Sequence, residues 1–123
     1  MNLSFFPDPN LAPKPREEIQ LESLGLTPYS DGRRVKVSLT ITPFMPMDRP
    51  SLEISVIDED NHLVASLSVV ETNIHKLDLT VHLKTEEQPE GQYTFRVDLY
   101  YDQDVQHSLQ ESIRLPEDIP VTG

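Results

Sequence analysis

The sequence has no cysteine, no tryptophan and only 4 glycines, and its 10 basic residues face 21 acidic ones in 123 residues. The absence of cysteine excludes disulfide bonds, thiol chemistry and thiolate metal sites. A net charge of −11 argues against binding to nucleic acid or to an anionic membrane, because phosphate contacts need clustered Lys and Arg. No run approaches the roughly 20 apolar residues of a transmembrane helix. Residues 1–10 lack the basic and apolar segments of a secretory signal, so we expect a cytoplasmic location.

Proline is abundant, with 11 residues in the chain, and it is concentrated before residue 17. A proline has no backbone N–H and favours an extended conformation in the residue before it. We therefore expect an extended, Pro-rich N-terminal arm over residues 1–16 and a single domain over residues 17–123, since this length supports one hydrophobic core. Within the arm, Phe5 and Phe6 belong either to a disordered terminus or to a segment that docks on the domain or on a partner.

Apolar and polar residues alternate along most of the chain after the arm. In the clearest run, residues 35–42, every odd position is Val, Leu or Ile and every even position is polar. A period of two is typical of a strand with one buried face. Similar runs predict seven strands, at 17–24, 34–42, 52–58, 63–70, 76–85, 92–101 and 105–115. Turn residues separate these runs, so the sequence predicts an all-β fold, a sandwich of antiparallel strands.

The stretch at residues 89–97 reads Pro-Glu-Gly-Gln-Tyr-Thr-Phe-Arg-Val and resembles part of immunoglobulin-like and fibronectin type III-like domains. In those families a glycine two residues before a tyrosine forms a corner, and the tyrosine hydroxyl bonds to upstream backbone. Gly91 and Tyr93 match this pattern, whereas Phe95 stands where antibody-type domains have a cysteine. The resemblance implies a seven-stranded antiparallel Ig-like β-sandwich. It implies nothing about a ligand, because this fold hosts many functions.

The most unusual segment is the loop at residues 43–50, where three prolines restrain bulky apolar side chains. Loops tend to be polar, so these side chains have one of two roles. Either Phe44 and Met47 fold inward and plug the end of the sandwich, or the loop is an adaptable surface that binds a partner. In the expected topology the loops at 70–75 and 102–104 share this end. The candidate partner-binding residues are Phe44, Met45, Met47, Ile74, Tyr100 and Tyr101.

Metal and catalytic sites find little support in the sequence. Acidic residues cluster at 58–60 and at 98–104, but the expected topology places these clusters at opposite ends, and Asp is an ordinary hairpin residue. The four histidines, which we do not expect to converge, are His62, His75, His82 and His107. We expect the last of them to lie at the edge of the core with a backbone partner. Because no Gly-x-Ser-x-Gly elbow or phosphate loop is present, we expect no enzyme, no cofactor and no metal centre.

These features favour a noncatalytic protein-interaction module that binds through the end carrying loop 43–50. The alternative is a self-associating structural protein, a homodimer formed through an exposed edge strand or through the outer face of one sheet. The Ig-like resemblance implies that this sheet holds the strands 63–70, 52–58, 92–101 and 105–115. Four residues share the outward parity on that face, namely Ile57, Val64, Val70 and Tyr100. A third alternative is a calcium-dependent binding domain.

Overall fold

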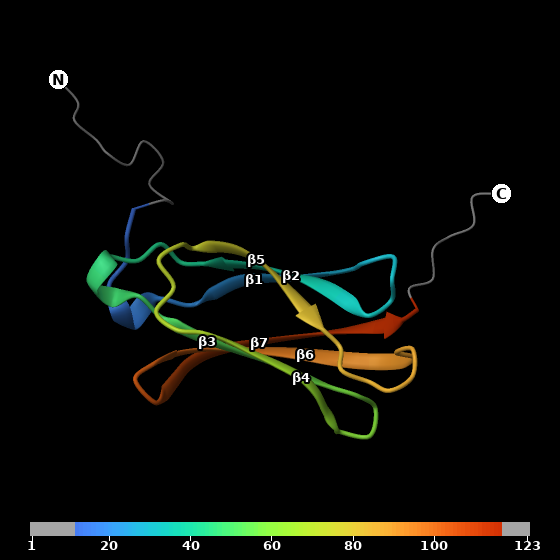
Figure 1. The fold of residues 1–123 in the computed structure, drawn as a ribbon. Helices are drawn as coiled ribbons and strands as arrows, with labels where there is room; N and C mark the ends of the chain where they lie inside the picture. Colours follow the sequence, from blue (N-terminus) through green and yellow to red (C-terminus); the bar gives the residue numbers. More distant parts are fainter. Residues whose placement is uncertain (1–11, 117–123) are drawn as a thin grey trace.

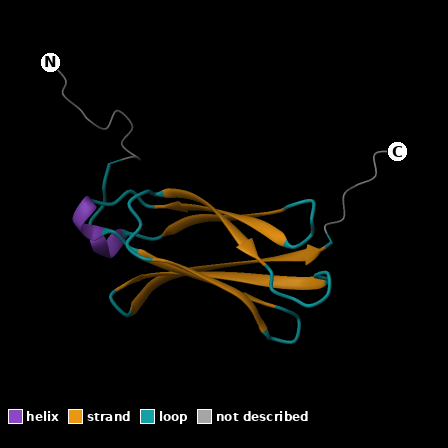
Figure 2. Cartoon of the chain, in the orientation of Figure 1, coloured by secondary structure: helices purple, strands orange, loops and turns teal. Residues whose placement is uncertain are grey.

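The computed structural model describes residues 12–116 of the chain, so the expectations for Phe5 and Phe6 lie outside the described residues. Two short 3₁₀ helices, η2 (Arg16–Glu18) and η3 (Pro46–Asp48), accompany seven strands in this part of the chain. The strands are β1 (Leu21–Pro28), β2 (Arg34–Ile41), β3 (Ser51–Ile57), β4 (Leu63–Val69), β5 (Lys76–His82), β6 (Gly91–Tyr101) and β7 (Asp104–Leu115). Figure 2 shows that nearly all of the regular structure is strand.

The strands form two antiparallel sheets that face each other (Figure 1). One sheet has the order β1-β2-β5 and the other has the order β4-β3-β6-β7. The seven-stranded antiparallel sandwich predicted from the alternating pattern is therefore confirmed. No helix among the described residues is long and apolar enough to cross a membrane.

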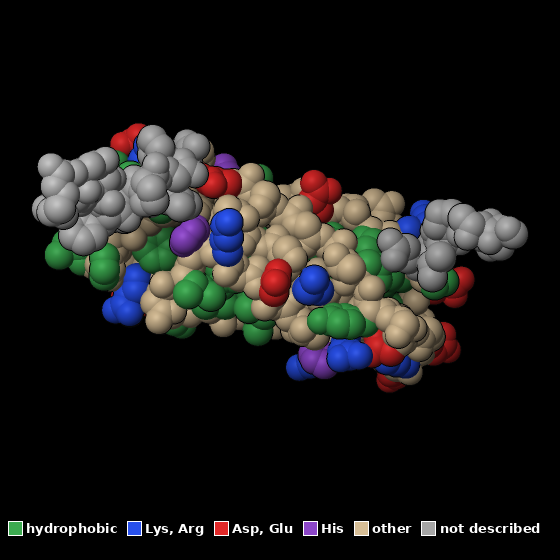
Figure 3. Space-filling model, turned by 90° about the horizontal axis from the view of Figure 1, so that it is seen from above, with side chains coloured by type: hydrophobic (Ala, Val, Ile, Leu, Met, Phe, Trp, Pro, Cys, Tyr) green, Lys and Arg blue, Asp and Glu red, His purple; other side chains and the backbone are tan. Residues whose placement is uncertain are grey.

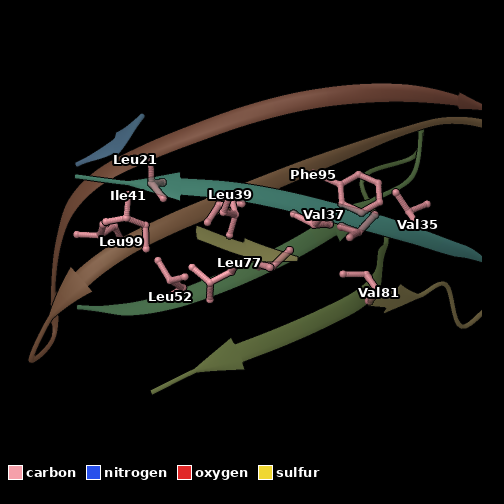
Figure 4. Packing of buried hydrophobic residues seen from close by; sticks show 14 of the residues in the cluster. Leu21, Val35, Val37, Leu39, Ile41, Leu52, Leu77, Val81, Phe95 and Leu99 are labelled. Carbon is pink, nitrogen blue, oxygen red and sulfur yellow. The ribbon is translucent and has the colours of Figure 1, made fainter. Parts of the chain in front are cut away.

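The core lies between the sheets and is built from the alternating apolar positions. In β2 the odd residues from Val35 to Ile41 are at most 2% exposed, while the even residues between them are partly exposed. Their side chains meet Phe95 and Leu99 of β6 and Leu52 of β3 from the opposite sheet (Figure 4). Full burial of each such side chain stabilises the fold by about 1.5–3 kcal/mol. The period of two thus indicates which face of each strand is buried.

Loops alternate between the two ends of the sandwich, as expected for successive antiparallel strands. At one end the backbone N–H of Thr72 donates to the carbonyl of Pro50 at 2.9 Å, which joins the β4–β5 loop to the β2–β3 loop. At the other end Gln88 Nε2 donates to the carbonyl of Asp31 at 2.8 Å, which joins the β5–β6 and β1–β2 loops. Figure 1 shows the two groups of loops at opposite ends of the sheets.

The first strand begins later than the sequence predicts, at Leu21 instead of residue 17. Residues 16–18 form η2, because the carbonyl of Pro15 accepts the N–H of Glu18 and closes a turn. Ile19 precedes the strand but is buried in the core. Its apolar side chain therefore indicates burial and not strand pairing. The difference arises from a local proline-led turn that the alternating pattern does not reveal.

The glycine–tyrosine corner is present only in part. Gly91 has φ 104°, a conformation that favours glycine, and Tyr93 is 4% exposed. The hydroxyl of Tyr93, however, makes no hydrogen bond with any described residue, so the backbone bond that the resemblance implies is not seen within residues 12–116. The corner here rests on the glycine conformation and on burial of the ring.

Candidate functional site

Exposed apolar side chains gather at the end of the sandwich that holds η3. Six large apolar side chains are exposed in the described part of the chain, namely Met45, Met47, Leu63, Val70, Ile74 and Val105. All except Leu63 lie in, or next to, the β2–β3, β4–β5 and β6–β7 loops. We call this surface, formed by Met45, Met47, Val70, Ile74 and Val105, the apolar end. Figure 3 shows hydrophobic side chains at the left of the molecule, where this end lies, and others along its lower edge and at the right. Concentration of apolar surface in one place is typical of an interaction site.

The 3₁₀ turn η3 holds the two methionines out of the core. Pro46 occupies the start of the turn, where its fixed φ favours helix entry, and the N–H of Asp48 donates to the carbonyl of Met45 at 2.8 Å. As a result Met45 is 47% exposed and Met47 is 82% exposed. The turn therefore displays two flexible thioether side chains to solvent.

Two residues far apart in the sequence, Arg16 and Tyr101, hold this turn in place through Asp48. Arg16 Nε lies 3.0 Å from Asp48 Oδ1, and the Tyr101 hydroxyl donates to the Asp48 carbonyl at 2.7 Å. The Arg16 guanidinium also lies over the Tyr101 ring, 4.7 Å from its centroid, in a cation–π contact. We call Arg16, Asp48 and Tyr101 the loop clamp. Burial of the phenol raises the pKa of Tyr101 to about 12, with nearby Asp48 acting in the same direction and Arg16 against it.

The structure divides the loop between the two orientations that the sequence left open, and the expectation that Met47 folds inward with Phe44 is wrong. Phe44 is half-buried and packs against the core, while Met47, three residues later, points outward. Lys14 forms a parallel β-bridge with Phe44, and its N–H donates to the carbonyl of Pro43 at 2.9 Å. The described part of the N-terminal segment therefore lies along the loop and covers one side of it.

The other candidate residues differ in exposure. Ile74 is 53% exposed in the β4–β5 loop, whereas Tyr101 is only 9% exposed at the end of β6. Tyr100 is half-buried on the opposite face of the same strand. Tyr101 thus contacts the loop from the core side. The exposed members of the candidate set are Met45, Met47 and Ile74.

Arg16 and Asp48 are functional candidates that the sequence did not single out. They stand 32 residues apart, in η2 and η3, and nothing in the local pattern of either segment indicates the other. The only available signal is the position of Arg16 directly after a proline, which indicates a turn but not a partner.

An acidic turn at the opposite end places Asp58, Asp60 and His62 together, with one ligand atom of each within 4.8 Å of the others. Asp58 Oδ1 accepts the backbone N–H groups of Asp60 and His62, both at 2.9 Å. The His62 N–H is the main cause of a lowered pKa at Asp58, with desolvation opposing it. Asn61 has φ 64°, a left-handed conformation that asparagine tolerates in turns. These bonds are those of a hairpin turn, which accounts for the cluster.

The histidines lie in separate elements, in the β3–β4 turn, before and at the end of β5, and in β7. His107 Nδ1 accepts the backbone N–H of Leu21 at 3.0 Å and is half-buried. The prediction of a backbone partner for His107 at the core edge is confirmed. This bond, together with Gln106 Nε2 donating to the carbonyl of Ile19 at 2.6 Å, ties the start of β7 to the start of β1.

Comparison with known proteins finds likeness in structure only. No family model and no curated protein matches the sequence. A glycosyl hydrolase family 2 member from Bacteroides cellulosilyticus has a TM-score of 0.59 at 19% identity, covering 78% of this chain and 14% of its own. A β-glucuronidase from Parabacteroides merdae has a TM-score of 0.62 at 16% identity, covering 79% of this chain and 14% of its own. The likeness shows the fold alone. The chain spans about one seventh of the length of these two enzymes.

Proposed function

We propose that the chain is a noncatalytic interaction module that binds a protein partner through the apolar end. The observation that carries this proposal is Met47, whose side chain is 82% exposed on a backbone that is held by Arg16 and Tyr101. A loop that is already restrained loses little conformational entropy when it binds a partner. An exposed apolar side chain on such a loop is therefore better suited to binding than one on a flexible loop. The loop clamp therefore supports a surface that is ready to bind.

The chemistry of the apolar end fits recognition better than catalysis. Its exposed groups are thioether and aliphatic side chains, which gain free energy by burial and do not transfer protons. Methionine adapts its shape to the partner, while the branched side chains of Ile74 and Val105 are stiffer and give the surface a fixed outline. The structural neighbours support a module role, because in them this fold makes up a small part of a much longer chain.

The test is photo-crosslinking from the apolar end, with the opposite end of the sandwich as the control. Leu63 is 63% exposed next to the β3–β4 turn. Like Met47 it is a large, exposed apolar side chain, but it lies at the opposite end of the sandwich. A photoreactive side chain at position 47 is expected to crosslink to a foreign protein in a cell extract, and one at position 63 is not.

Two substitutions then test which side chains contribute. Met47→Ser combined with Ile74→Ser is expected to weaken capture of the crosslinked partner at least about tenfold, whereas Leu63→Ser leaves it unchanged. Capture that survives the double substitution but is lost in Leu63→Ser would place the interaction at the opposite end and contradict the proposal. A crosslinked product consisting only of this chain would replace a foreign partner with a second copy.

A further inference from the structure

The outer strand β4 has a free edge that lacks the protection usual for edge strands. It pairs with β3 on one side and with no strand of residues 12–116 on the other. Residues 63–70 read Leu-Val-Ala-Ser-Leu-Ser-Val-Val, without a charge, a proline or a glycine. Edge strands present unpaired N–H and C=O groups that can pair with another chain, and proteins normally block them with Lys, Pro or a covering segment. The sequence of β4 itself has none of these devices, although a register shift interrupts its first residues and Lys84 and His82 line a hollow with Ala65, Ser66 and Leu67.

The direction of the backbone groups along this edge follows from one hydrogen bond. The carbonyl of Val64 accepts the N–H of Lys84 at 3.1 Å, so the backbone of Val64 faces away from β3. In an antiparallel strand, successive residues direct their backbone groups to alternate sides. Ala65 and Leu67 therefore bond to β3, while the N–H and C=O groups of Ser66 and Ser68 face the free edge.

The side chains of Ser66 and Ser68 leave this edge accessible. Both are exposed on the outer face of the sheet, and they are small, so they do not obstruct an approaching strand. Ser68 donates its hydroxyl to Glu53 on the neighbouring strand, which directs that side chain away from the edge. The alternate residues Ala65 and Leu67 point into the core and anchor the strand from the inside. The backbone groups at this edge are thus accessible, while core packing of the alternate side chains holds the strand in place.

The other outer strands carry their own protection. β5 includes Lys76 and Asp78, and β1 includes Gly25 and ends at Pro28. β7 carries three charged residues and lies against β1, to which His107 attaches it, while Gln106 bonds to Ile19 just before β1. Among the four outer strands, only β4 has an uncharged sequence throughout.

Charge decides which occupant suits this edge. Each molecule carries a net charge of −11, so two copies meet with least repulsion where neither carries charge. A two-fold contact places a surface against itself, and β4 is the outer strand in which this brings no like charges opposite each other. The outer face of the same sheet is less suitable, since Glu53 and Asp98 are partners in its central strand pair.

We propose that two copies of the chain pair antiparallel through β4, so that two four-stranded sheets become one continuous sheet. The contact is formed by the backbone groups of Ser66 and Ser68, each residue exchanging N–H···O bonds with the other copy. This pairing uses one side of the sandwich and leaves Met45, Met47, Ile74 and Val105 free, although Val70 of the apolar end directly follows the paired strand. It is therefore independent of the proposed binding of a foreign partner.

The test is sedimentation equilibrium of the full chain, with charge substitutions at the two edges of one row of the sheet. Cross-strand register places Ser66, Ser55, Arg96 and Gln110 in that row. Ser66→Lys adds a positive charge at the β4 edge, and Gln110→Lys adds the same charge at the β7 edge. We expect the wild type and Gln110→Lys to approach twice the 14.0 kDa chain mass as concentration rises, and Ser66→Lys to dimerise at least about tenfold more weakly.

Hydrogen exchange gives a second readout at single residues. The amides of Ser66 and Ser68 are expected to become protected as the dimer forms, while those of Ala65 and Leu67 are protected at every concentration. Ser66→Pro removes one donor from the free edge without removing a bond to β3, so it should fold and remain monomeric. Circular dichroism checks the fold of each variant.

Three results would overturn the proposal. The first is a wild type that stays monomeric at all concentrations, with unprotected Ser66 and Ser68 amides. The second is a dimer that Ser66→Lys does not weaken. The third is a dimer that Met47→Ser abolishes and Ser66→Lys leaves intact, which would place the self-contact at the apolar end.

Discussion

The hydroxyl of Tyr101 donates a 2.7 Å hydrogen bond to the backbone carbonyl of Asp48, and this bond joins the last residue of β6 to the turn η3. The two residues are 53 positions apart, so the bond attaches the loop directly to the central strands of the sandwich. A rigid strand end beneath a turn that exposes Met47 is the arrangement on which the proposed binding surface depends.

Replacing Tyr101 with Phe tests this attachment. Tyr101→Phe keeps the buried ring and removes one hydrogen bond, so we expect the free energy of unfolding to fall by about 1 kcal/mol in urea titrations. Tyr100→Phe is the control, because the Tyr100 hydroxyl makes no hydrogen bond within the described residues. Equal losses in the two variants would contradict a specific role for the bond to Asp48.

The same phenol predicts a loss of stability in alkali. Burial raises the pKa of Tyr101 from its ordinary value of 10.0 to about 12, so the folded state favours the protonated form. The resulting stabilisation is fully present below pH 10 and is lost as the pH rises towards 12. Unfolding measured across this range should show a component that Tyr101→Phe removes. A pH profile that is identical in the two proteins would contradict the assignment.

Phe44 and Met47 should respond in opposite ways to the same substitution. Phe44 is half-buried against the core, so Phe44→Ser is expected to lower the free energy of unfolding by about 2 kcal/mol. Met47 is 82% exposed, so Met47→Ser should change it by less than about 0.5 kcal/mol. Urea unfolding of both variants decides the matter. A large loss in Met47→Ser would mean that this side chain is buried in solution.

The sequence predicted the sandwich because its buried faces are built from strict alternation. β2 buries every second residue over its whole length and β6 does so from Tyr93 to Tyr101, and a period of two cannot be mistaken for a helix over such runs. Turn residues such as Asn61 then fixed where the chain reverses. The local sequence is sufficient to predict these strands, because the alternation within each strand indicates which face is buried.

The site was less predictable because it depends on contacts between distant segments. The segment around Phe44 and Met47 has no periodicity, so its inward and outward residues could not be told apart before the turn η3 was known. The pairing of Arg16 with Asp48 is a tertiary contact between two short 3₁₀ turns, and neither turn has a sequence signal for the other. The order of the four-stranded sheet followed from the Ig-like resemblance and not from the strand patterns alone, and it places β4 at an edge.

Arg16 should restrain the loop more than it stabilises the fold. Its ion pair with Asp48 is solvent-accessible, with side-chain exposures of 45% and 22%, and such pairs contribute about 0.2–1 kcal/mol. Arg16→Gln should therefore leave the melting temperature nearly unchanged but increase hydrogen exchange at the Asp48 amide, which bonds to the Met45 carbonyl. Lys14→Gln is the control for the lost positive charge, since the Lys14 side chain forms no ion pair within residues 12–116. Unchanged exchange in Arg16→Gln would show that Tyr101 alone holds the loop.

Gly91 should be far less tolerant of alanine than Gly25, although both lie in strands. Gly91 has φ 104°, and a Cβ there would stand 2.8 Å from Glu59 Oε1, the oxygen that accepts the Gln92 N–H at 2.6 Å. Gly91→Ala is therefore expected to lower the free energy of unfolding by more than about 1 kcal/mol. At Gly25 the nearest atom to an added Cβ, the Cβ of Ser38, is at 3.8 Å.

Gly25→Ala should thus leave the stability unchanged or raise it by up to about 1 kcal/mol, because alanine reduces the entropy of the unfolded chain. The double variant Gly91→Ala with Glu59→Ala separates the two costs at Gly91. Truncating Glu59 removes the steric conflict but leaves the backbone strain, so the double variant should recover only part of the loss relative to Glu59→Ala alone. Full recovery in urea unfolding would mean that the contact with Glu59, and not the positive φ, requires glycine at the corner before Tyr93.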